Sequence, residues 1–394
     1  MDDCCIIGGG VVGLSIAREL AGRGLAVRVL TRDPARGTTS WAAAGIFPPA
    51  PERPNAPPGE ALTAWSDRLH WQWAAELLAE TGIDTGLAKC GGLHVAAAGP
   101  ALAALDRAAE DWRAINARCE RLVGAAVAAL EPTLAGAVAS GAIATGLLLP
   151  DETQIRPPRH LEALARSCAA RGVALVPNAV VHGIRREGRR IDRLAATIDG
   201  REESVRAGSY VLAAGAWSEG LAADLGLRIA TTPIRGQIML LRQPAATLGR
   251  VLNRGLDYLV PRPDGRLLVG STLEDAGFDA ATTPAAIDRL QGVARELLGA
   301  AAAGRPVEAT WAGLRPGSAD GLPTIGRIPG LDDAFVAAGH FRAGWHQSPG
   351  TAVIVADLVT GRRPPLDPAA FAPDRTPVVG HRESVAALLA RARG

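Results

Sequence analysis

Three glycines near the N-terminus have the spacing of a phosphate-binding turn. Gly8, Gly10 and Gly13 fit the pattern G-x-G-x-x-G between an apolar run at residues 4–7 and a helical pattern at residues 14–23. In such a strand–turn–helix unit the first glycine permits the turn, and the second lets the backbone approach a pyrophosphate. The third lets the helix pack on the strand, with the helix N-terminus facing the phosphate charge. The sequence therefore predicts a dinucleotide site.

The next predicted strand, residues 26–30, departs from that pattern. Such a strand normally ends in an acidic residue that binds the adenosine ribose. Thr31 occupies the expected position, and Asp33 follows between Arg32 and Arg36. A missing acid with arginines nearby is typical of proteins that bind the 2′-phosphate of NADP. At this point the sequence leaves NADP open.

The C-terminal third holds the other residues with chemistry of their own. Arg315 ends a predicted strand directly before Pro316, and residues 339–347 join a strand at 334–338 to a helix that reaches about residue 360. A strand-to-helix turn directs backbone amides and the positive helix end at an anionic ligand atom. No Ser-His-Asp order, pair of catalytic carboxylates or metal-ligand spacing competes with this turn.

Hydrophobic periodicity predicts the elements that position these motifs. Helices are expected at residues 60–80, 101–121, 157–171 and 284–298. Strands are expected at 93–98, 173–176, 179–184, 210–213, 237–241, 258–262, 266–271 and 309–314. The strand at 210–213 ends in small residues, so it is suited to approach the same pyrophosphate as the first glycine turn. The first unit is therefore interrupted, and the later strands form a second sheet with a hairpin turn at 263–265.

Charge and cysteine content argue against several classes of protein. The 42 basic and 40 acidic residues nearly cancel, so no net field favours a nucleic acid. The five cysteines form no C-x-x-C pair, which disfavours a disulfide framework and a zinc site. The acidic N-terminus is unlike a secretory signal, and no stretch has the hydrophobicity of a membrane span. We therefore expect a cytoplasmic protein with no metal, no nucleic-acid partner and no membrane partner.

Taken together, the motifs resemble the amino-acid oxidase superfamily of FAD flavoproteins, and within it the glycine oxidases of thiamin-thiazole biosynthesis. The resemblance runs nearly end to end, because many matches occur in the same order. They lie in the glycine turn and at residues 40–45, 89–91, 151–157, 213–217, 233–237, 258–265, 311–316, 320–323 and 339–342. Residues after about 367 add nothing to it.

The resemblance implies an α/β fold in which a split, glutathione-reductase-like FAD-binding Rossmann domain is interleaved with an antiparallel β-sheet substrate domain. The FAD-binding domain would comprise residues 1–85, 141–222 and 323–366. The substrate-binding domain would comprise residues 86–140 and 223–322, and residues 367–394 would form a C-terminal tail. FAD then replaces NADP as the expected cofactor, and Thr31 and Asp33 become a variation on its ribose contact.

The resemblance also implies the site residues. Arg315 and Tyr258 would hold the carboxylate of a small amino acid substrate, with Arg342 nearby, because a guanidinium pairs with a carboxylate through two parallel hydrogen bonds. FAD would be bound by Gly8, Gly10, Val12, Gly13, Thr31, Arg32, Thr39, Ser40, Ala43, Ala44, Gly45, Val180, Ala214, Gly215, Trp217, Gly313, Arg315, His340, Arg342, Gly344, Trp345, His346 and Gln347. Molecular oxygen or another acceptor would take the electrons, and a homo-oligomer is left open.

Some positions differ from the glycine oxidases near the flavin and in the substrate pocket. Ala343 replaces an asparagine, Trp345-His346-Gln347 replaces an aliphatic stretch, and Leu256 stands where a histidine lines the relatives' pocket. These changes leave the choice among glycine, sarcosine and a small D-amino acid open. His346 is interpreted as a helix-start residue in preference to a catalytic base. Two other classes also stay open: a dehydrogenase or N-demethylase of the same fold that passes electrons to a carrier, and a non-catalytic FAD-binding protein.

Overall fold

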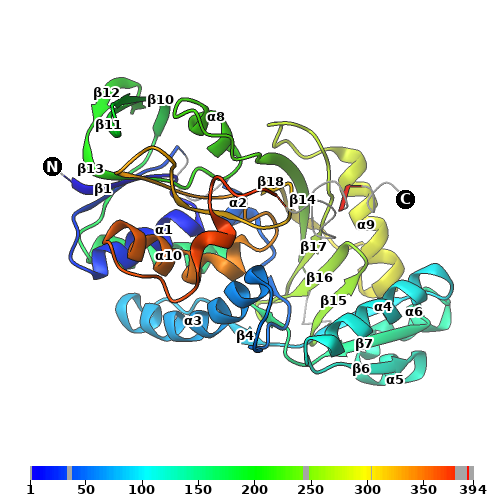
Figure 1. Cartoon of the computed structure of the whole chain (residues 1–394). Coiled ribbons are helices and arrows are strands. Elements are labelled where there is room, and N and C mark those ends of the chain that lie inside the picture. Colours follow the sequence, from blue (N-terminus) through cyan, green and yellow to red (C-terminus); the bar gives the residue numbers. More distant parts are fainter. Residues whose placement is uncertain (1, 33–37, 243–247, 303, 378–387, 390–394) are drawn as a thin grey trace.

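Two large sheets lie side by side in the computed structural model, which describes residues 2–32, 38–242, 248–302, 304–377 and 388–389 (Figure 1). Asp33 and Arg36, considered above for the ribose contact, lie outside these ranges. One sheet is mainly parallel and the other mainly antiparallel. Each is assembled from segments that are far apart in the sequence, so the predicted interleaved α/β fold is confirmed.

The parallel sheet has the strand order β19-β20-β13-β1-β2-β9. Its strands are β1 (Asp2–Ile7), β2 (Val27–Leu30), β9 (Ala174–Val176), β13 (Ala207–Leu212), β19 (Thr324–Arg327) and β20 (Ala334–Ala338). β1 pairs in parallel with β2 and β13, and β13 pairs in parallel with β20. Only β19 runs antiparallel to its neighbour. The carboxyl ends of β1, β13 and β20 therefore meet at one edge, which is where ligands bind in open parallel sheets.

Helices cover one face of this sheet, and a small antiparallel sheet covers the other. The helices are α1 (Val11–Gly22), α3 (Pro58–Thr81), α7 (Pro157–Ala170) and α10 (Gly344–Val359). Fully buried side chains from the four helices and the sheet, such as Ile16, Leu62, Leu164 and Val355, form one core cluster. The small sheet consists of β10 (Ala179–Glu187), β11 (Arg190–Ile198) and β12 (Arg201–Val205). It packs on the opposite face around Cys5, Leu194 and Tyr210.

The second large sheet has the strand order β18-β14-β17-β16-β15-β5-β7-β6. Its strands are β5 (Gly92–Ala96), β6 (Glu120–Val123), β7 (Thr145–Leu149), β14 (Thr232–Arg242), β15 (Val251–Arg254), β16 (Asp257–Pro261), β17 (Arg266–Gly270) and β18 (Val307–Gly317). Helix α9 (Pro284–Leu298) packs on one face through Leu290 and Leu297, on the side away from α1 and α10 (Figure 1). The other face is therefore turned toward the parallel sheet.

The remaining elements are one longer helix and a set of short helices, strands and turns. They are α2 (Thr39–Ala42), α4 (Pro100–Ala114), α5 (Gly124–Leu130), α6 (Ala135–Ala139), α8 (Ser218–Ala223), β3 (Ile46–Phe47), β4 (Ala88–Lys89) and β8 (Thr153–Gln154), with 3₁₀ turns at Pro132–Leu134, Gly215–Trp217, Gly299–Ala301 and Pro368–Phe371. The strands β3, β8 and β4 form a small sheet of their own.

Two expectations from the sequence need correction. The helix expected at residues 101–121 ends at Ala114, because Asn116 takes a left-handed conformation (φ 60°) and the chain then enters β6. The expected domain boundary at residue 141 comes too early, since β7 pairs with β5 and β6 in the eight-stranded sheet. The other domain limits stay predictions.

The C-terminal tail contributes contacts that the sequence did not indicate. Phe371 is buried in the helical core cluster, and Arg375 forms an ion pair with the buried Asp320. Leu388 packs against Ile234 and Phe341. The described parts of the tail thus fasten the two large sheets from outside.

Gly13 is the position where helix α1 comes closest to the first glycine turn. A Cβ atom there would lie 1.8 Å from the Gly8 carbonyl oxygen, which is backbone and cannot rotate away. We predict that Gly13→Ala lowers the free energy of unfolding by about 2 kcal/mol, because it forces helix and strand apart. Thermal unfolding of the purified protein measures this.

Gly292 in α9 provides the matched control, since a Cβ atom there would meet nothing within 4 Å. Gly292→Ala should raise stability by about 0.5–1 kcal/mol through the reduced entropy of the unfolded chain. A Gly13→Ala protein that melts at the wild-type temperature would contradict the packing role of Gly13.

Candidate active site

A cavity of about 1950 Å³ runs between the parallel sheet and the inner face of the eight-stranded sheet. Sites for drug-sized ligands occupy about 300–1,000 Å³, so this cavity has room for a large cofactor together with a substrate. Every residue that the sequence predicted for the site lines this cavity, with the exception of Gly13. Gly13 lies beneath the glycine turn, where it has the packing role described above.

The glycine turn lines one end of the cavity. Gly8 has a φ of +117°, and a Cβ atom there would lie 2.3 Å from the carbonyl oxygen of Ala213, so the turn passes directly over the end of β13. Gly10 is the N-cap of α1, and the Val11 amide donates to Ser40 Oγ at 3.0 Å. A side chain on Gly10 would occupy this space. The positive helix end and the missing side chain together fit a pyrophosphate.

The opposite wall of this end is formed by residues after β2, β9 and β13. The Arg32 guanidinium lies over the Trp217 ring at 4.1 Å from its centroid, and Trp217 contacts Phe278. Thr31 lies directly beside the glycine turn, because a Cβ atom on Gly9 would come within 2.7 Å of its Cβ. Val180, Ala214 and Gly215 complete the wall.

The segment 38–45 lines the middle of the cavity and is held by hydrogen bonds to β18 and α10. Trp345 Nε1 donates to the Ser40 carbonyl at 2.9 Å, and Trp311 Nε1 donates to the Ala42 carbonyl at 3.0 Å. Thr39 Oγ1 donates to the Leu314 carbonyl at 2.6 Å.

Arg262 holds the end of the same segment. It is buried, and its guanidinium donates to the carbonyl oxygens of Ala44 at 2.7 Å and Ile155 at 3.1 Å. Gly45 needs its glycine here, with φ +71° and a Cβ position only 2.3 Å from the Ile155 oxygen. Sequence reasoning gave Arg262 no role, because a carbonyl-binding arginine has no local motif.

The N-terminus of α10 points into the cavity, as the strand-to-helix turn predicted. The helix begins at Gly344 and has no side-chain cap. Gln347 donates to Thr63 Oγ1 at 3.0 Å, while its buried Oε1 has no hydrogen-bond partner among the described residues. A buried acceptor of this kind next to unpaired helix amides fits a ligand that brings its own donors.

The two histidines of this turn are engaged with the protein. His340 Nε2 lies 3.1 Å from Thr351 Oγ1, and burial lowers the pKa of its imidazole to about 3, so it stays neutral. His346 Nε2 contacts Asp67 Oδ1 at 2.9 Å, and its ring stacks on Phe47 at a centroid distance of 4.5 Å. His346 thus ties α10 to α3, in keeping with its interpretation as a helix-start residue.

Arg315 and Tyr258 both rest on glycines of the sheet. A Cβ atom on Gly236 would lie 2.2 Å from Arg315 Nη1, and one on Gly270 would lie 2.6 Å from the Tyr258 ring. Arg315 Nη2 donates to Ser271 Oγ at 2.9 Å. Burial lowers the pKa of the Arg315 guanidinium; nearby Tyr258 opposes this shift, and Arg342 adds to it.

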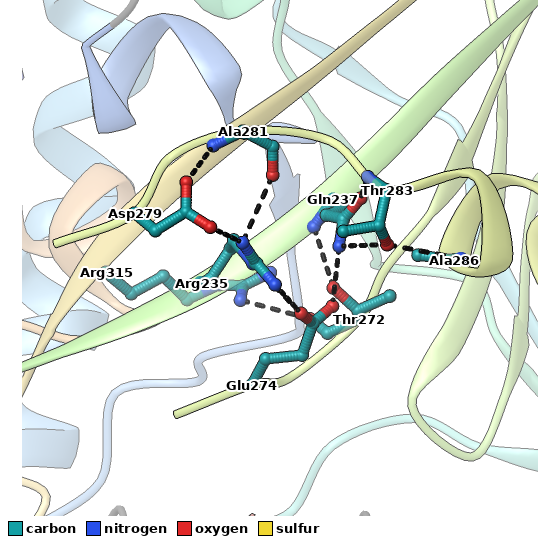
Figure 2. A network of polar contacts seen from close by, with 9 residues as sticks. All are labelled: Arg235, Gln237, Thr272, Glu274, Asp279, Ala281, Thr283, Ala286 and Arg315. Atoms are coloured by element: carbon teal, nitrogen blue, oxygen red, sulfur yellow. Dashed lines mark hydrogen bonds and ion pairs between the residues drawn. The ribbon is translucent and has the colours of Figure 1, made fainter. Parts of the chain in front are cut away.

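A polar network fixes the loop that approaches Arg315 from the other side (Figure 2). Arg235 on β14 binds Glu274 and Asp279, and Gln237 binds Glu274 and Thr283. The backbone N–H of Gln237 also donates to Thr272 Oγ1. The Thr272 carbonyl oxygen in turn accepts from Arg315 Nη1. Glu274 is therefore occupied by Arg235, and no described carboxylate forms an ion pair with Arg315.

Comparison with known proteins identifies the family. A family model described as "FAD dependent oxidoreductase" (DAO) matches residues 3–358. The chain belongs to this family. A glycine oxidase of Pseudomonas aeruginosa is 36% identical over 369 residues, which cover 93% of this chain and 97% of that protein. The crystal structure of glycine oxidase from Geobacillus kaustophilus matches with a TM-score of 0.87 at 32% identity, covering 95% of this chain and 99% of the other.

A more distant relative has a different activity in its name. A D-amino acid dehydrogenase of Methylobacterium nodulans is 29% identical and covers 92% of this chain and 96% of that protein. The family makes this protein an FAD-dependent oxidoreductase of amino acids, so the predicted cofactor, FAD, is confirmed in place of the NADP alternative.

Two absences within the described residues concern membranes and metals. No helix there is long and apolar enough to cross a membrane. No group of three His, Cys, Asp or Glu side chains in the same part of the chain has a metal-binding arrangement.

The phosphate cradle gives a direct test of the cofactor site. We predict that Gly10→Val abolishes FAD binding, because the new side chain fills the place of the pyrophosphate. The flavin-to-protein ratio of the purified variant, from its visible absorbance, measures this. Gly183→Val in β10 is the matched control, since a Cβ atom there meets nothing closer than 3.6 Å. A folded Gly10→Val protein with full FAD content would overturn the assignment.

Proposed function

We propose that the protein oxidises a small amino acid, namely glycine, sarcosine or a small D-amino acid, at its Cα–N bond. When bound, FAD supplies the redox chemistry by taking the hydride from Cα and passing two electrons to molecular oxygen, which yields hydrogen peroxide. The imine product then hydrolyses in water to a 2-oxo acid and ammonia, or a primary amine when the substrate is N-methylated. The remaining work of the protein is to bind, orient and desolvate the substrate.

The observation that carries this proposal is an unpaired guanidinium on the cavity face of the sheet. Arg315 donates from Nη1 to the Thr272 carbonyl and from Nη2 to Ser271 Oγ, and its guanidinium forms no ion pair with a carboxylate among the described residues. Tyr258 lies on the same sheet face, and Arg342 is exposed to the same cavity. A substrate carboxylate would complete this arrangement through charge-assisted, bidentate hydrogen bonds.

The proposal assigns the other roles to what surrounds the anchor. Positive charge from Arg315 and Arg342 binds the carboxylate and orients Cα toward the segment 38–45. The proposal gives neither histidine of the turn the role of a base: burial lowers the pKa of His340 to about 3, and His346 ties α10 to Asp67 of α3. The amine is therefore expected to lose its proton to solvent before oxidation, so kcat/KM should rise with pH until the substrate amine is neutral.

The electron acceptor separates the two catalytic alternatives. Purified holoenzyme is mixed anaerobically with glycine, sarcosine, D-alanine or D-proline, and bleaching of the flavin identifies the substrate. Admission of oxygen should then restore the oxidised spectrum rapidly and release hydrogen peroxide. Slow recovery in oxygen, with fast recovery on an electron carrier, would support a dehydrogenase or N-demethylase instead. If no amine bleaches the flavin, the protein is a non-catalytic FAD-binding protein and the proposal fails.

Substitution of Arg315, the proposed carboxylate anchor, tests whether this residue binds the substrate or only stabilises the fold. We predict that Arg315→Ala lowers kcat/KM by about a hundredfold, because a partly desolvated charge-assisted pair is lost. Arg315→Lys should recover only part of this, since an ammonium cannot reproduce the fork. Steady-state kinetics on the substrate found above measures both variants.

Arg266 on β17 gives the control for these variants. It forms its ion pair with Glu308 on the exposed side of the protein, and Arg266→Ala should leave kcat/KM within about twofold. FAD content is measured for every variant. If Arg315→Ala is as active as wild type, the carboxylate is bound elsewhere, and if its activity is lost only through loss of FAD, Arg315 is structural.

A further inference from the structure

A second polar cluster lines the same cavity beyond Tyr258. It consists of His94 on β5, Asn253 on β15 and Glu152 between β7 and β8. His94 Nε2 lies 2.9 Å from Glu152 Oε2, and Asn253 Nδ2 donates to Glu152 Oε1 at 2.9 Å. None of the three is among the residues predicted to bind FAD or the substrate carboxylate.

Strand register places this cluster in line with the proposed carboxylate anchor. Tyr258 is the cross-strand partner of Asn253, and Asn253 is the partner of His94. Partners in register point to the same sheet face, and neighbouring strands are about 4.8 Å apart. Asn253 therefore lies one strand spacing from Tyr258 and His94 lies two, along the wall of one cavity.

The carboxylate of Glu152 is built into this wall. Glu152 is fully buried. A Cβ atom on Gly92 would lie 2.2 Å from Glu152 Cδ, so the carboxylate occupies the space that a side chain at position 92 would fill. A buried carboxylate costs free energy unless it is bonded, and both of its oxygens are bonded by the neighbours named above. The negative charge is thus fixed behind the two partly exposed side chains.

The groups left facing the cavity are hydrogen-bond acceptors. His94 uses Nε2 on Glu152, and in the tautomer that carries its proton on Nε2 the free Nδ1 is an acceptor. Asn253 uses its amide nitrogen on Glu152, which leaves its Oδ1 as an acceptor. Glu110 of α4, the helix that packs on β5, also lines this cavity. Two acceptors backed by a buried carboxylate are complementary to a cationic donor.

We propose that His94, Asn253 and Glu152 form a subsite for an ammonium group on the substrate side chain. This inference rests on the proposed function and enlarges its substrate class to amino acids with a side-chain amine a few carbon atoms from Cα. The carboxylate end binds at Arg315 and Tyr258, and the distal ammonium reaches Asn253 and His94, one and two strands beyond Tyr258. A bifunctional substrate of this kind matches the opposite charges at the two ends of the wall.

Binding of carboxylate ligands to the holoenzyme tests the subsite without turnover. Pentanoate and 5-aminopentanoate share one carbon chain and differ by a terminal ammonium. Titration of each, followed by perturbation of the bound flavin spectrum, gives two Kd values. We expect 5-aminopentanoate to bind about tenfold tighter to the wild type, as for one added charge-assisted hydrogen bond. Equal affinities, or tighter binding of pentanoate, would overturn the inference.

Glu152→Gln removes the charge and keeps the volume, and it should bring the ratio of the two Kd values close to one. The matched control is Glu202→Gln, because Glu202 has the same contact to a histidine, His182, but is exposed on β12. Its ratio should stay at the wild-type value. A ratio that survives Glu152→Gln, or that is lost equally in Glu202→Gln, contradicts the assignment. If Glu152→Gln does not fold, Asn253→Leu serves instead, because it removes an acceptor and keeps the His94–Glu152 contact.

The same titration distinguishes failure of this inference from failure of the proposed function. If both carboxylates perturb the flavin and compete with a small amino acid substrate, but show no preference, only the subsite is wrong. If neither carboxylate binds and none of the four amino acids bleaches the flavin, the proposed function is wrong and the subsite inference falls with it. In turnover, 2,5-diaminopentanoic acid should exceed 2-aminopentanoic acid in kcat/KM by a similar factor of about ten.

Discussion

The structure depends on how one small-residue segment, 38–45, is fixed between the two sheets. The carbonyl oxygens of this segment are bound by donors from elsewhere: Trp311 from β18, Trp345 from α10 and Arg262 from the end of β16. Each buried carbonyl needs such a donor, because an unpaired one costs about 1–3 kcal/mol. These bonds therefore hold the cofactor loop, the helix N-terminus and the substrate sheet at fixed distances.

A second constraint is that polar side chains on the sheet wall stand over glycines. Arg315 occupies the space above Gly236, Tyr258 that above Gly270, and the Glu152 carboxylate that above Gly92. A larger residue below any of them would push the functional group into the cavity. The glycines thus set the depth of the wall, and the strand register sets the spacing of the groups along it. This geometry carries both the proposed carboxylate anchor and the proposed ammonium subsite.

Much of the fold was predictable because its signals are local. The glycine turn, most strands of both sheets and the start of α10 follow from periodicity and from turn residues that lie close together in the sequence. Local signals also failed in places. The pattern at 101–121 continued past Asn116, where a single left-handed residue ends the helix, and the membership of β7 depended on pairing with the distant β5.

The sequence by itself predicted a dinucleotide and a place for its phosphates, because a glycine turn acts through its own backbone. Only the tertiary structure decided which side chains act together. His94, Glu152 and Asn253 lie up to 159 residues apart, and nothing near any of them indicates the other two. Arg262 likewise binds a carbonyl 218 residues away. Cross-strand register and the packing of one sheet against another create these neighbours, and neither is written in any single stretch of the chain.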